Sequence, residues 1–307
     1  MKRILITNAD GNLGAGISKL LAENFSKREL YLVALVNESV CIAADLCHQV
    51  VSYPTECCID GSYEIEPLIA LCNAHSIDAI IPLTDHETVV LSEHRERLPY
   101  LFCSDHKLSL DCYDKWDFHQ LLREMDADCP QTWLPSDCPP LNIDYLVKPR
   151  TGGLSMGIKT GSPNLSGFGD DHIVQEMLGG KEVTVAIYRN PDGTVWGPFV
   201  GSRKLFNGMT CYFKPLEPNS GLKQFVDVFS QQSGWHGPCN IQGMLDGERF
   251  VPFEINLRFS GSSSLRDLLG FRDVIWAVEK WLGHEPEANW QVDNQTAIRY
   301  FSDHLMA

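Results

Sequence analysis

The stretch FVPFEINLR, residues 250–258, places a carboxylate, an amide and a guanidinium at alternate positions. Residues two apart on an extended strand project to the same face, so Glu254, Asn256 and Arg258 are predicted to share one face. The apolar residues between them are predicted to pack on the opposite face: Phe253, Ile255 and Leu257. This alternation predicts a face that binds a hard cation and an anion together.

A second strand is predicted directly before this one. Residues 240–245 and 250–255 flank Asp246-Gly247-Glu248, which indicates a strand–turn–strand unit in which Gln242 stands across from Glu254. Carboxylate and amide oxygens suit Mg²⁺, which keeps several waters and binds substrate phosphates. Gln242, Glu254 and Asn256 are therefore the candidate metal ligands. The alternative to a metal site is an ordinary polar face of the strand that is exposed to solvent.

Lys148 ends an apolar strand in YLVKPR, residues 145–150, and the glycine-rich TGGLSMG, residues 151–157, follows it. A lysine beside a glycine loop suits a polyphosphate, because backbone N–H groups surround the oxygens while the ammonium neutralises charge. Taken alone, Lys148 would read as a surface lysine before an ordinary loop. Together with the strand at 250–258 it indicates a site for a phosphate ester and its cation.

Two further segments fit the same ligand. An extended hinge at 174–178, VQEML, can offer backbone groups to the edge of an adenine, and Glu182 can accept from ribose hydroxyls. Arg203, in SRKLFNGMT at 202–210, is a candidate second contact to phosphate or carboxylate. The alternatives are a solvated carboxylate at a strand start for Glu182 and an exposed strand-end arginine for Arg203.

The first hundred residues alternate strand and helix, which predicts an open parallel sheet with helices on both faces. Beyond about residue 109 the pattern predicts an α+β part with antiparallel hairpins, and the boundary is placed near 104–109. The predicted strands are 4–7, 30–36, 50–53, 79–83, 101–103, 145–148, 172–175, 182–188 and 195–200, and the predicted helices are 16–24, 65–75, 87–97 and 114–125.

A glycine turn, TNADGNLGAG at residues 7–16, follows the first predicted strand and opens a helix. Such a turn can hold a dinucleotide pyrophosphate at the helix N-terminus, so an NAD(P)-dependent oxidoreductase or epimerase is an alternative function. The spacing is G-x-x-G-x-G instead of G-x-G-x-x-G, and Tyr53, Tyr63 and Tyr100 are not followed by lysine four residues on. The turn is as compatible with tight strand–helix packing.

Composition limits the function classes. The chain has 307 residues, 44% of them hydrophobic, and a formal net charge of −15, which argues against nucleic acid as a partner. No apolar run reaches the length of a membrane span, and MKRILI at the start predicts a strand instead of a signal peptide. Eleven cysteines without a C-x-x-C pair indicate reduced thiols and a cytoplasmic location.

Taken together, these segments resemble the ATP-grasp superfamily, in particular the synthetase units of the carbamoyl phosphate synthetase large subunit; Gln242, where many members have aspartate, suggests that branch. The resemblance implies a Rossmann-like pre-ATP-grasp domain at 1–106 and an ATP-grasp domain at 107–307, whose two α+β subdomains clamp ATP. The lid subdomain would span about 115–178 and the metal-binding subdomain about 179–307.

The resemblance also implies roles for individual residues. Lys115 matches the first nucleotide lysine, Lys148 the second, Glu254 a ligand bridging two magnesium ions, and Arg258 the arginine that steadies an acyl phosphate. The expected catalytic residues are Arg258 and Arg203. The expected nucleotide-binding residues are Lys115, Lys148, Gly152, Gly153, Ser155, Gln175, Glu176, Leu178 and Glu182.

The expected activity is that of an ATP- and Mg²⁺-dependent ligase that joins a small carboxylate to an amine, or to a thiol, through an acyl phosphate and releases ADP and phosphate. Mn²⁺ is an expected substitute for Mg²⁺, and a homodimer is implied because related enzymes are often dimers. A catalytically silent ATP-binding subunit and phosphoryl transfer to an acceptor that is not a carboxylate remain alternatives. The chain holds one synthetase unit and no evident glutaminase, which argues against carbamoyl phosphate synthesis itself.

Overall fold

A five-stranded parallel sheet forms the amino-terminal part of the protein. The computed structural model describes residues 1–37, 41–53, 58–59, 62–152, 157–292 and 294–300. In spatial order, the strands of this sheet are β3 (Gln49–Ser52), β2 (Leu30–Val36), β1 (Lys2–Ile6), β6 (Ala79–Ile81) and β7 (Tyr100–Leu101). The short strands β4 (Cys58–Ile59) and β5 (Ser62–Tyr63) form a separate antiparallel pair.

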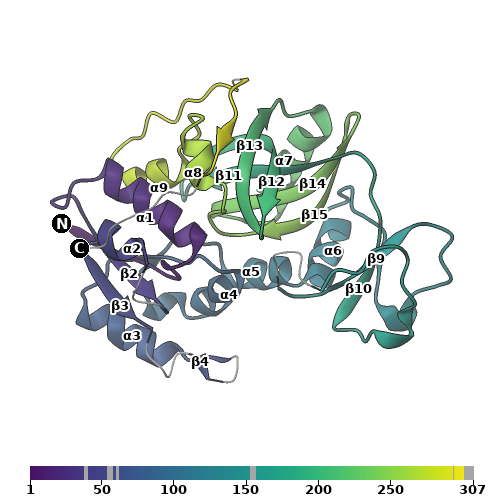
Figure 1. Ribbon diagram of the computed structural model, residues 1–307, viewed down its shortest axis with the longest axis horizontal. Coiled ribbons are helices and arrows are strands. Elements are labelled where there is room, and N and C mark those ends of the chain that lie inside the picture. Colours follow the sequence, from purple (N-terminus) through teal and green to yellow (C-terminus); the bar gives the residue numbers. More distant parts are fainter. Residues whose placement is uncertain (38–40, 54–57, 60–61, 153–156, 293, 301–307) are drawn as a thin grey trace.

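Helices bury both faces of the parallel sheet (Figure 1). On one face Ile4 and Ile6 pack in a core that includes helices α1 (Asn12–Asn24) and α9 (Asp273–Trp281). On the other face Leu5 packs with α3 (Ile65–Ala74) and α4 (Asp85–Glu93). The short helix α2 (Ala43–Leu46) precedes β3. Because both faces are covered, the run LYLVALV of β2 is apolar without alternation.

A small antiparallel sheet, here named the lid sheet, projects away from the amino-terminal part (Figure 1). In spatial order its strands are β8 (Thr132–Trp133), β10 (His172–Glu176) and β9 (Tyr145–Pro149). Helices α5 (His106–Tyr113) and α6 (Lys115–Glu124) precede it in the chain. Single 3-10 turns lie at 95–97, 135–137 and 165–167.

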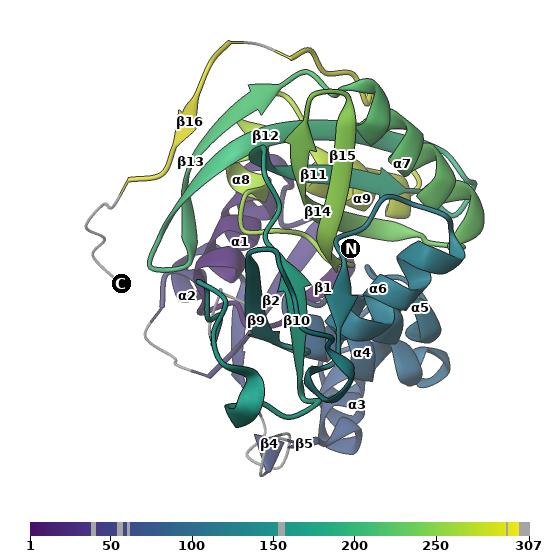
Figure 2. The same cartoon turned by 90° about the vertical axis from the view of Figure 1, so that its right-hand side faces the viewer.

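A six-stranded antiparallel sheet forms the carboxy-terminal part. In spatial order its strands are β15 (Arg249–Asn256), β14 (Gly237–Asp246), β11 (Lys181–Arg189), β12 (Val195–Phe206), β13 (Met209–Leu216) and β16 (Ala297–Ile298). Its core on one side includes α5, α6 and α7 (Ser220–Gln232), and α8 (Ser263–Asp267) and α9 belong to the core on the other. Viewed in Figure 2, the lid strands β9 and β10 lie in front of and below this sheet.

The predicted combination of a parallel α/β part with an antiparallel α+β part is confirmed, and the elements differ from the prediction mainly at their ends. Strand β12 extends to Phe206, beyond the predicted end at 200, and α4 begins at Asp85, where the Thr84 side chain accepts from the Glu87 amide. Helix α7 was not predicted, although its buried residues follow helical spacing: Leu222, Phe225, Val226 and Phe229.

The glycine turn has a packing role. A Cβ atom at Gly14 would lie 2.4 Å from the Ala9 Cα and from the Asn8 carbonyl oxygen, a distance that no side chain tolerates. Asn8 itself has a positive φ of 45°. Gly14, in the first turn of α1, is therefore required by close contact between the helix and the residues that follow β1, independent of any dinucleotide.

Candidate functional site

Strands β14 and β15 bring the predicted metal ligands together. Gln242 pairs directly with Glu254 in the antiparallel register, as predicted. The amide nitrogens of Gln242 and Asn256 each donate to Glu254 Oε1 at 3.1 Å. The three side chains therefore form one connected group centred on a carboxylate.

The predicted position of Phe253 is wrong. The β14–β15 register shifts between Gln242 and Gly243, so that Phe253 is an extra residue on β15. The bulge interrupts the alternation of faces, and Phe253 lines the same cavity as Glu254. Ile255 and Leu257 do pack in the hydrophobic core, as predicted.

Two lysines face this strand pair from the lid side. Lys148, at the end of β9, is only 5% exposed, and its ammonium lies 5.4 Å from the centre of the Phe253 ring. Burial lowers the pKa of Lys148 to about 8, against the opposing charge of Glu254. Burial likewise lowers the pKa of Lys115, while Glu254, Asp85 and Asp114 oppose the shift. Both ammonium groups are partly desolvated, and an anionic ligand would stabilise their charged forms.

Lys115 also holds the start of the glycine loop. Its ammonium donates to the carbonyl oxygens of Gly152 at 2.8 Å and Arg150 at 3.3 Å. Asp114 caps the helix that begins at Lys115 by accepting from the amides of Trp116 and Asp117. The predicted loop residues Gly153 and Ser155 lie outside the described residues.

A cavity of about 320 Å³ lies between the lid sheet and strands β11, β12, β14 and β15. Ten of the predicted residues line it: Lys115, Lys148, Gly152, Gln175, Glu176, Leu178, Glu182, Arg203, Gln242 and Glu254. Sequence reasoning missed the apolar residues Leu146, Ile158, Met244 and Phe253, which also line it. Leu146 and Met244 could have been found, because each lies two positions from a predicted ligand on the same strand. The volume and the apolar lining suit a nucleotide-sized ligand.

The hinge residues are held by the chain itself. Glu176 accepts from the Gln131 backbone amide at 2.9 Å and from the Gln131 side chain at 3.2 Å. Gln175 is buried and donates to the Thr132 hydroxyl at 3.0 Å. The backbone amides of Glu176 and Met177 also have partners, since they donate to the carbonyls of Gln131 at 3.0 Å and Asp144 at 2.9 Å. Leu178 also lines the cavity and is the hinge residue left to contact a ligand.

Arg203 bridges two of the predicted ligand groups. Its guanidinium donates to Gln242 Oε1 and lies 3.7 Å from a carboxylate oxygen of Glu182. Among the described residues, no group of three or more His, Cys, Asp or Glu side chains could hold a metal ion. One carboxylate with two amides is nevertheless a donor set that suits Mg²⁺ bound with phosphates, and the oxygen of Gln242 already accepts from a cation.

Arg258 lies beyond the cavity, toward the amino-terminal sheet. Its guanidinium donates to Asp85 Oδ2 at 2.8 Å and to the Phe259 carbonyl at 3.1 Å. Neither Arg258 nor Asn256 lines the cavity. Most of the predicted residues therefore line one cavity. Asn256 lies outside the lining but is hydrogen-bonded to Glu254, and Arg258 joins the carboxy-terminal part of the chain to the amino-terminal part.

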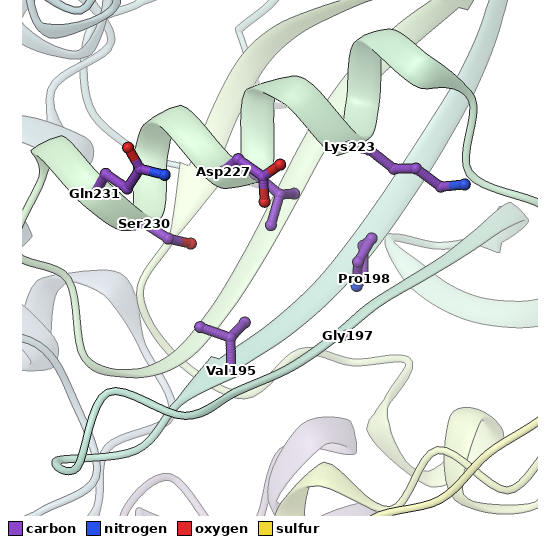
Figure 3. A pocket seen from close by; sticks show the side chains of 8 residues that line it. Val195, Gly197, Pro198, Lys223, Asp227, Ser230 and Gln231 are labelled. Atoms are coloured by element: carbon purple, nitrogen blue, oxygen red, sulfur yellow. The ribbon is translucent and has the colours of Figure 1, made fainter.

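A second cavity, of about 220 Å³, lies between α7 and β12 (Figure 3). Its polar side chains come from α7 and include Lys223, Asp227 and Ser230, opposite Val195 and Pro198 of β12. Lys223 and Asp227 are exposed. None of the predicted site residues lines this cavity.

In the described part of the chain, no helix is both long and apolar enough to cross a bilayer.

A family model described as "ATP-grasp in the biosynthetic pathway with Ter operon" matches residues 169–304. No curated protein matches the sequence.

Solved structures share the fold over nearly the whole chain. N5-carboxyaminoimidazole synthetase from Staphylococcus aureus, complexed with ADP, has a TM-score of 0.74 at 14% identity and covers 95% of this chain and 80% of its own. Phosphoribosylglycinamide synthetase from Anaerococcus prevotii has a TM-score of 0.69 at 14% identity, covering 96% and 79%. The biotin carboxylase domain dimer of Hydrogenobacter thermophilus 2-oxoglutarate carboxylase, in complex with MgADP, ADP and bicarbonate, has 0.71 at 13%, covering 93% and 70%.

These structures define the class: the protein has the ATP-grasp fold that they share. The family model covers residues 169–304 only, so the fold is what these comparisons confirm of the predicted resemblance.

Proposed function

We propose that the protein is an ATP-dependent ligase that joins a small, amino-acid-like carboxylate to an amine through an acyl phosphate. The observation that carries the proposal is the cavity in which the buried Lys148 and the partly buried Lys115 face a connected Gln242–Glu254–Asn256 group. The shared fold supports it, because S. aureus N5-carboxyaminoimidazole synthetase has been solved with ADP. The glycine turn gives no comparable support to a dinucleotide, since packing accounts for Gly14.

The side chains have distinct roles in nucleotide binding. Leu146, Leu178 and Met244 would enclose the adenine, and Glu182 would accept from the ribose hydroxyls. Lys148 and Lys115 would neutralise the phosphates, whose negative charge would offset the desolvation that lowers the pKa of both lysines. Arg203 would exchange its contact with Gln242 for a phosphate or carboxylate oxygen.

Gln242, Glu254 and Asn256 are the residues that would hold Mg²⁺, which when bound neutralises charge on the phosphate oxygens. The amide at Gln242 is the feature that favours the carbamoyl-phosphate-synthetase-like branch. With a single carboxylate in the set, the phosphates would supply most of the negative charge around the ion, so metal and nucleotide are expected to bind together.

The reaction would take place in two steps. A carboxylate oxygen of the substrate attacks the γ-phosphorus of ATP, the bond to the β–γ bridging oxygen breaks, and ADP leaves. The amine nitrogen then attacks the acyl carbon, phosphate leaves with the former carboxylate oxygen, and the nitrogen loses a proton. Lys148 and Arg258 would stabilise the charge that develops on the transferred group. A thiol acceptor follows the same scheme, and a homodimer is part of the proposal.

The test is ADP release against a crossed panel of carboxylates and amines, with the product mass measured. The proposal predicts ADP only when both substrates are present, and a product mass equal to their sum less one water. Equal ADP formation with either substrate omitted would point to a phosphotransferase or an ATPase. Absence of MgATP binding would exclude the ligase altogether.

A further inference from the structure

The strand order of the amino-terminal sheet reverses at β1. The chain goes from β1 to β2 and β3 on one side and then crosses to β6 on the other side of β1. In open parallel sheets, the crevice at the carboxyl ends of the strands at such a reversal is where ligands bind. Here those ends are Thr7 and Asn8 after β1 and the segment Pro82–Asp85 after β6.

A buried carboxylate fixes this crevice. Glu87, in the first turn of α4, is 3% exposed and accepts from Thr7 at 2.8 Å, Asn8 at 2.8 Å and Thr84 at 3.1 Å through one oxygen. The hydroxyl of Tyr53 donates to the other oxygen. The Thr84–Glu87 turn is thereby tied to the ends of β1 and β3 and fixed in position.

Asp85 projects from this fixed turn to the carboxy-terminal part. Its Oδ2 accepts from Arg258 Nη2 at 2.8 Å, and the side chains are 26% and 17% exposed. The pair joins residues 173 positions apart in the chain. Arg258 also donates to the backbone carbonyl of Phe259, and its buried Nε has no hydrogen-bond partner in the described part of the protein. Asp85 is therefore the group that fixes the direction of the guanidinium.

Asp85 also influences Lys115, which is assigned to the nucleotide phosphates. Its charge is felt at Lys115, together with that of Glu254, although Asp85 does not line the nucleotide-sized cavity. Asp85 is thus paired with the arginine assigned to the transferred group, and its charge also acts on the lysine assigned to the phosphates. By contrast the Glu66–Arg97 pair of the same domain is 66% and 48% exposed.

We propose that Asp85 is a positioning residue that aims Arg258 at the transferred phosphoryl group, so that the fixed turn of the amino-terminal sheet is part of the reaction centre. The inference rests on the proposed ligase function. It predicts that loss of the Asp85 carboxylate affects the chemical step and leaves nucleotide binding intact, because neither member of the pair lines the cavity.

The experiment compares the wild type with D85N, D85A and, as the matched control, E66Q. MgADP affinity is measured by calorimetry, and kcat and KM are measured with the carboxylate–amine pair that releases most ADP. D85N and D85A should lower kcat by roughly 10- to 100-fold, as expected for a misaligned catalytic group, with KM for MgATP and MgADP affinity within about twofold. E66Q should match the wild type within about twofold.

A double-mutant cycle with R258Q completes the test. If Asp85 acts through Arg258, then D85N should cost little further activity in the R258Q background. Wild-type kcat in both D85N and D85A, additive losses in the cycle, or a loss confined to MgADP affinity would overturn the inference. A wild-type protein that binds no MgADP would instead refute the proposed function. If the melting temperature falls in D85A but not in D85N, the isosteric D85N is the variant whose kcat decides whether Asp85 positions Arg258.

Discussion

The lid side of the cavity, formed by the lid sheet and the start of α6, carries Lys148 and Lys115, whereas the opposite side, on β14 and β15, carries Glu254 bonded to two amides. On the β14–β15 side the chain satisfies its own polar groups, since both amides donate to Glu254 and Arg203 donates to Gln242. On the lid side, burial depresses the pKa of both lysines. We infer that the lysines of the lid side supply most of the binding energy for a polyanion. The pre-arranged polar groups of β14 and β15 supply the geometry that the reaction needs.

The largest expected effect is that of removing the carboxylate at the centre of the β14–β15 group. Glu254→Ala should lower the rate of ADP release at least about 100-fold, because both amides lose their acceptor and the metal site loses its charge. Steady-state turnover and a melting curve measure this. Asp246→Ala, an exposed acid on the same hairpin, should keep wild-type turnover. Near-normal ADP release by the Glu254 variant would remove this side of the cavity from the chemistry.

A second prediction concerns the stability cost of the lid-side charge. The fall of the Lys148 pKa from 10.5 to about 8 corresponds to about 3 kcal/mol against the charged form. Lys148→Met should therefore raise the free energy of unfolding of the nucleotide-free protein at pH 7 by up to about 3 kcal/mol. Urea denaturation measures it, and a less stable variant would contradict the assignment of Lys148 as an unpaired buried cation.

The pH dependence of the same lysine has a definite sign. Between pH 8 and 10.5 the unfolded chain holds a proton on Lys148 that the folded chain has lost, so wild-type stability should gain a contribution from this residue as pH rises through that window. The Lys148→Met variant should lack that contribution. MgATP affinity should change in the opposite direction and fall above pH 8, as the ammonium that binds phosphate is lost.

Nucleotide affinity should depend on the charge of Lys148. Lys148→Ala should weaken MgATP binding roughly 10- to 100-fold, the value of a charge-assisted hydrogen bond, whereas Lys148→Arg should retain part of the affinity. Lys223→Ala, in the α7–β12 cavity of Figure 3, should leave it unchanged. Calorimetric titration distinguishes these cases, and an equal loss in the Lys223 variant would make the effect non-specific.

The smallest effect separates two phenylalanines of β15. Phe253 lines the cavity below Lys148, whereas Phe250 is buried in the core. Phe253→Leu should lower MgATP affinity by a few-fold through the lost cation–π contact and packing. Phe250→Leu should lower stability and leave affinity unchanged. The reverse pattern would show that β15 continues its alternation through residue 253.

The elements that the sequence predicts well are those whose local pattern and tertiary environment agree. β2 has the predicted bounds, because a parallel strand buried on both faces is apolar throughout. The pairing of Gln242 with Glu254 followed from a short hairpin turn, where Gly247 has a positive φ of 57°. Most cavity residues were found through the resemblance to a family, and their individual roles remain predictions.

Features that arise from register or from long-range contacts could not be predicted. The bulge that turns Phe253 into the cavity leaves no mark in the strand pattern. The Asp85–Arg258 pair depends on how two parts of the chain pack. Gly14 illustrates the converse, since its pattern suggested a ligand and close packing accounts for it.

The central claim is that the cavity between the lid sheet and β14–β15 binds MgATP through Lys148. Its most direct test is calorimetric titration of MgATP and of NADPH into the wild type and into Lys148→Ala. The account predicts saturable, one-to-one MgATP binding to the wild type, binding weakened roughly 10- to 100-fold in the variant, and no heat from NADPH. Saturable NADPH binding without MgATP binding, or MgATP binding that is unchanged in the variant, would contradict it.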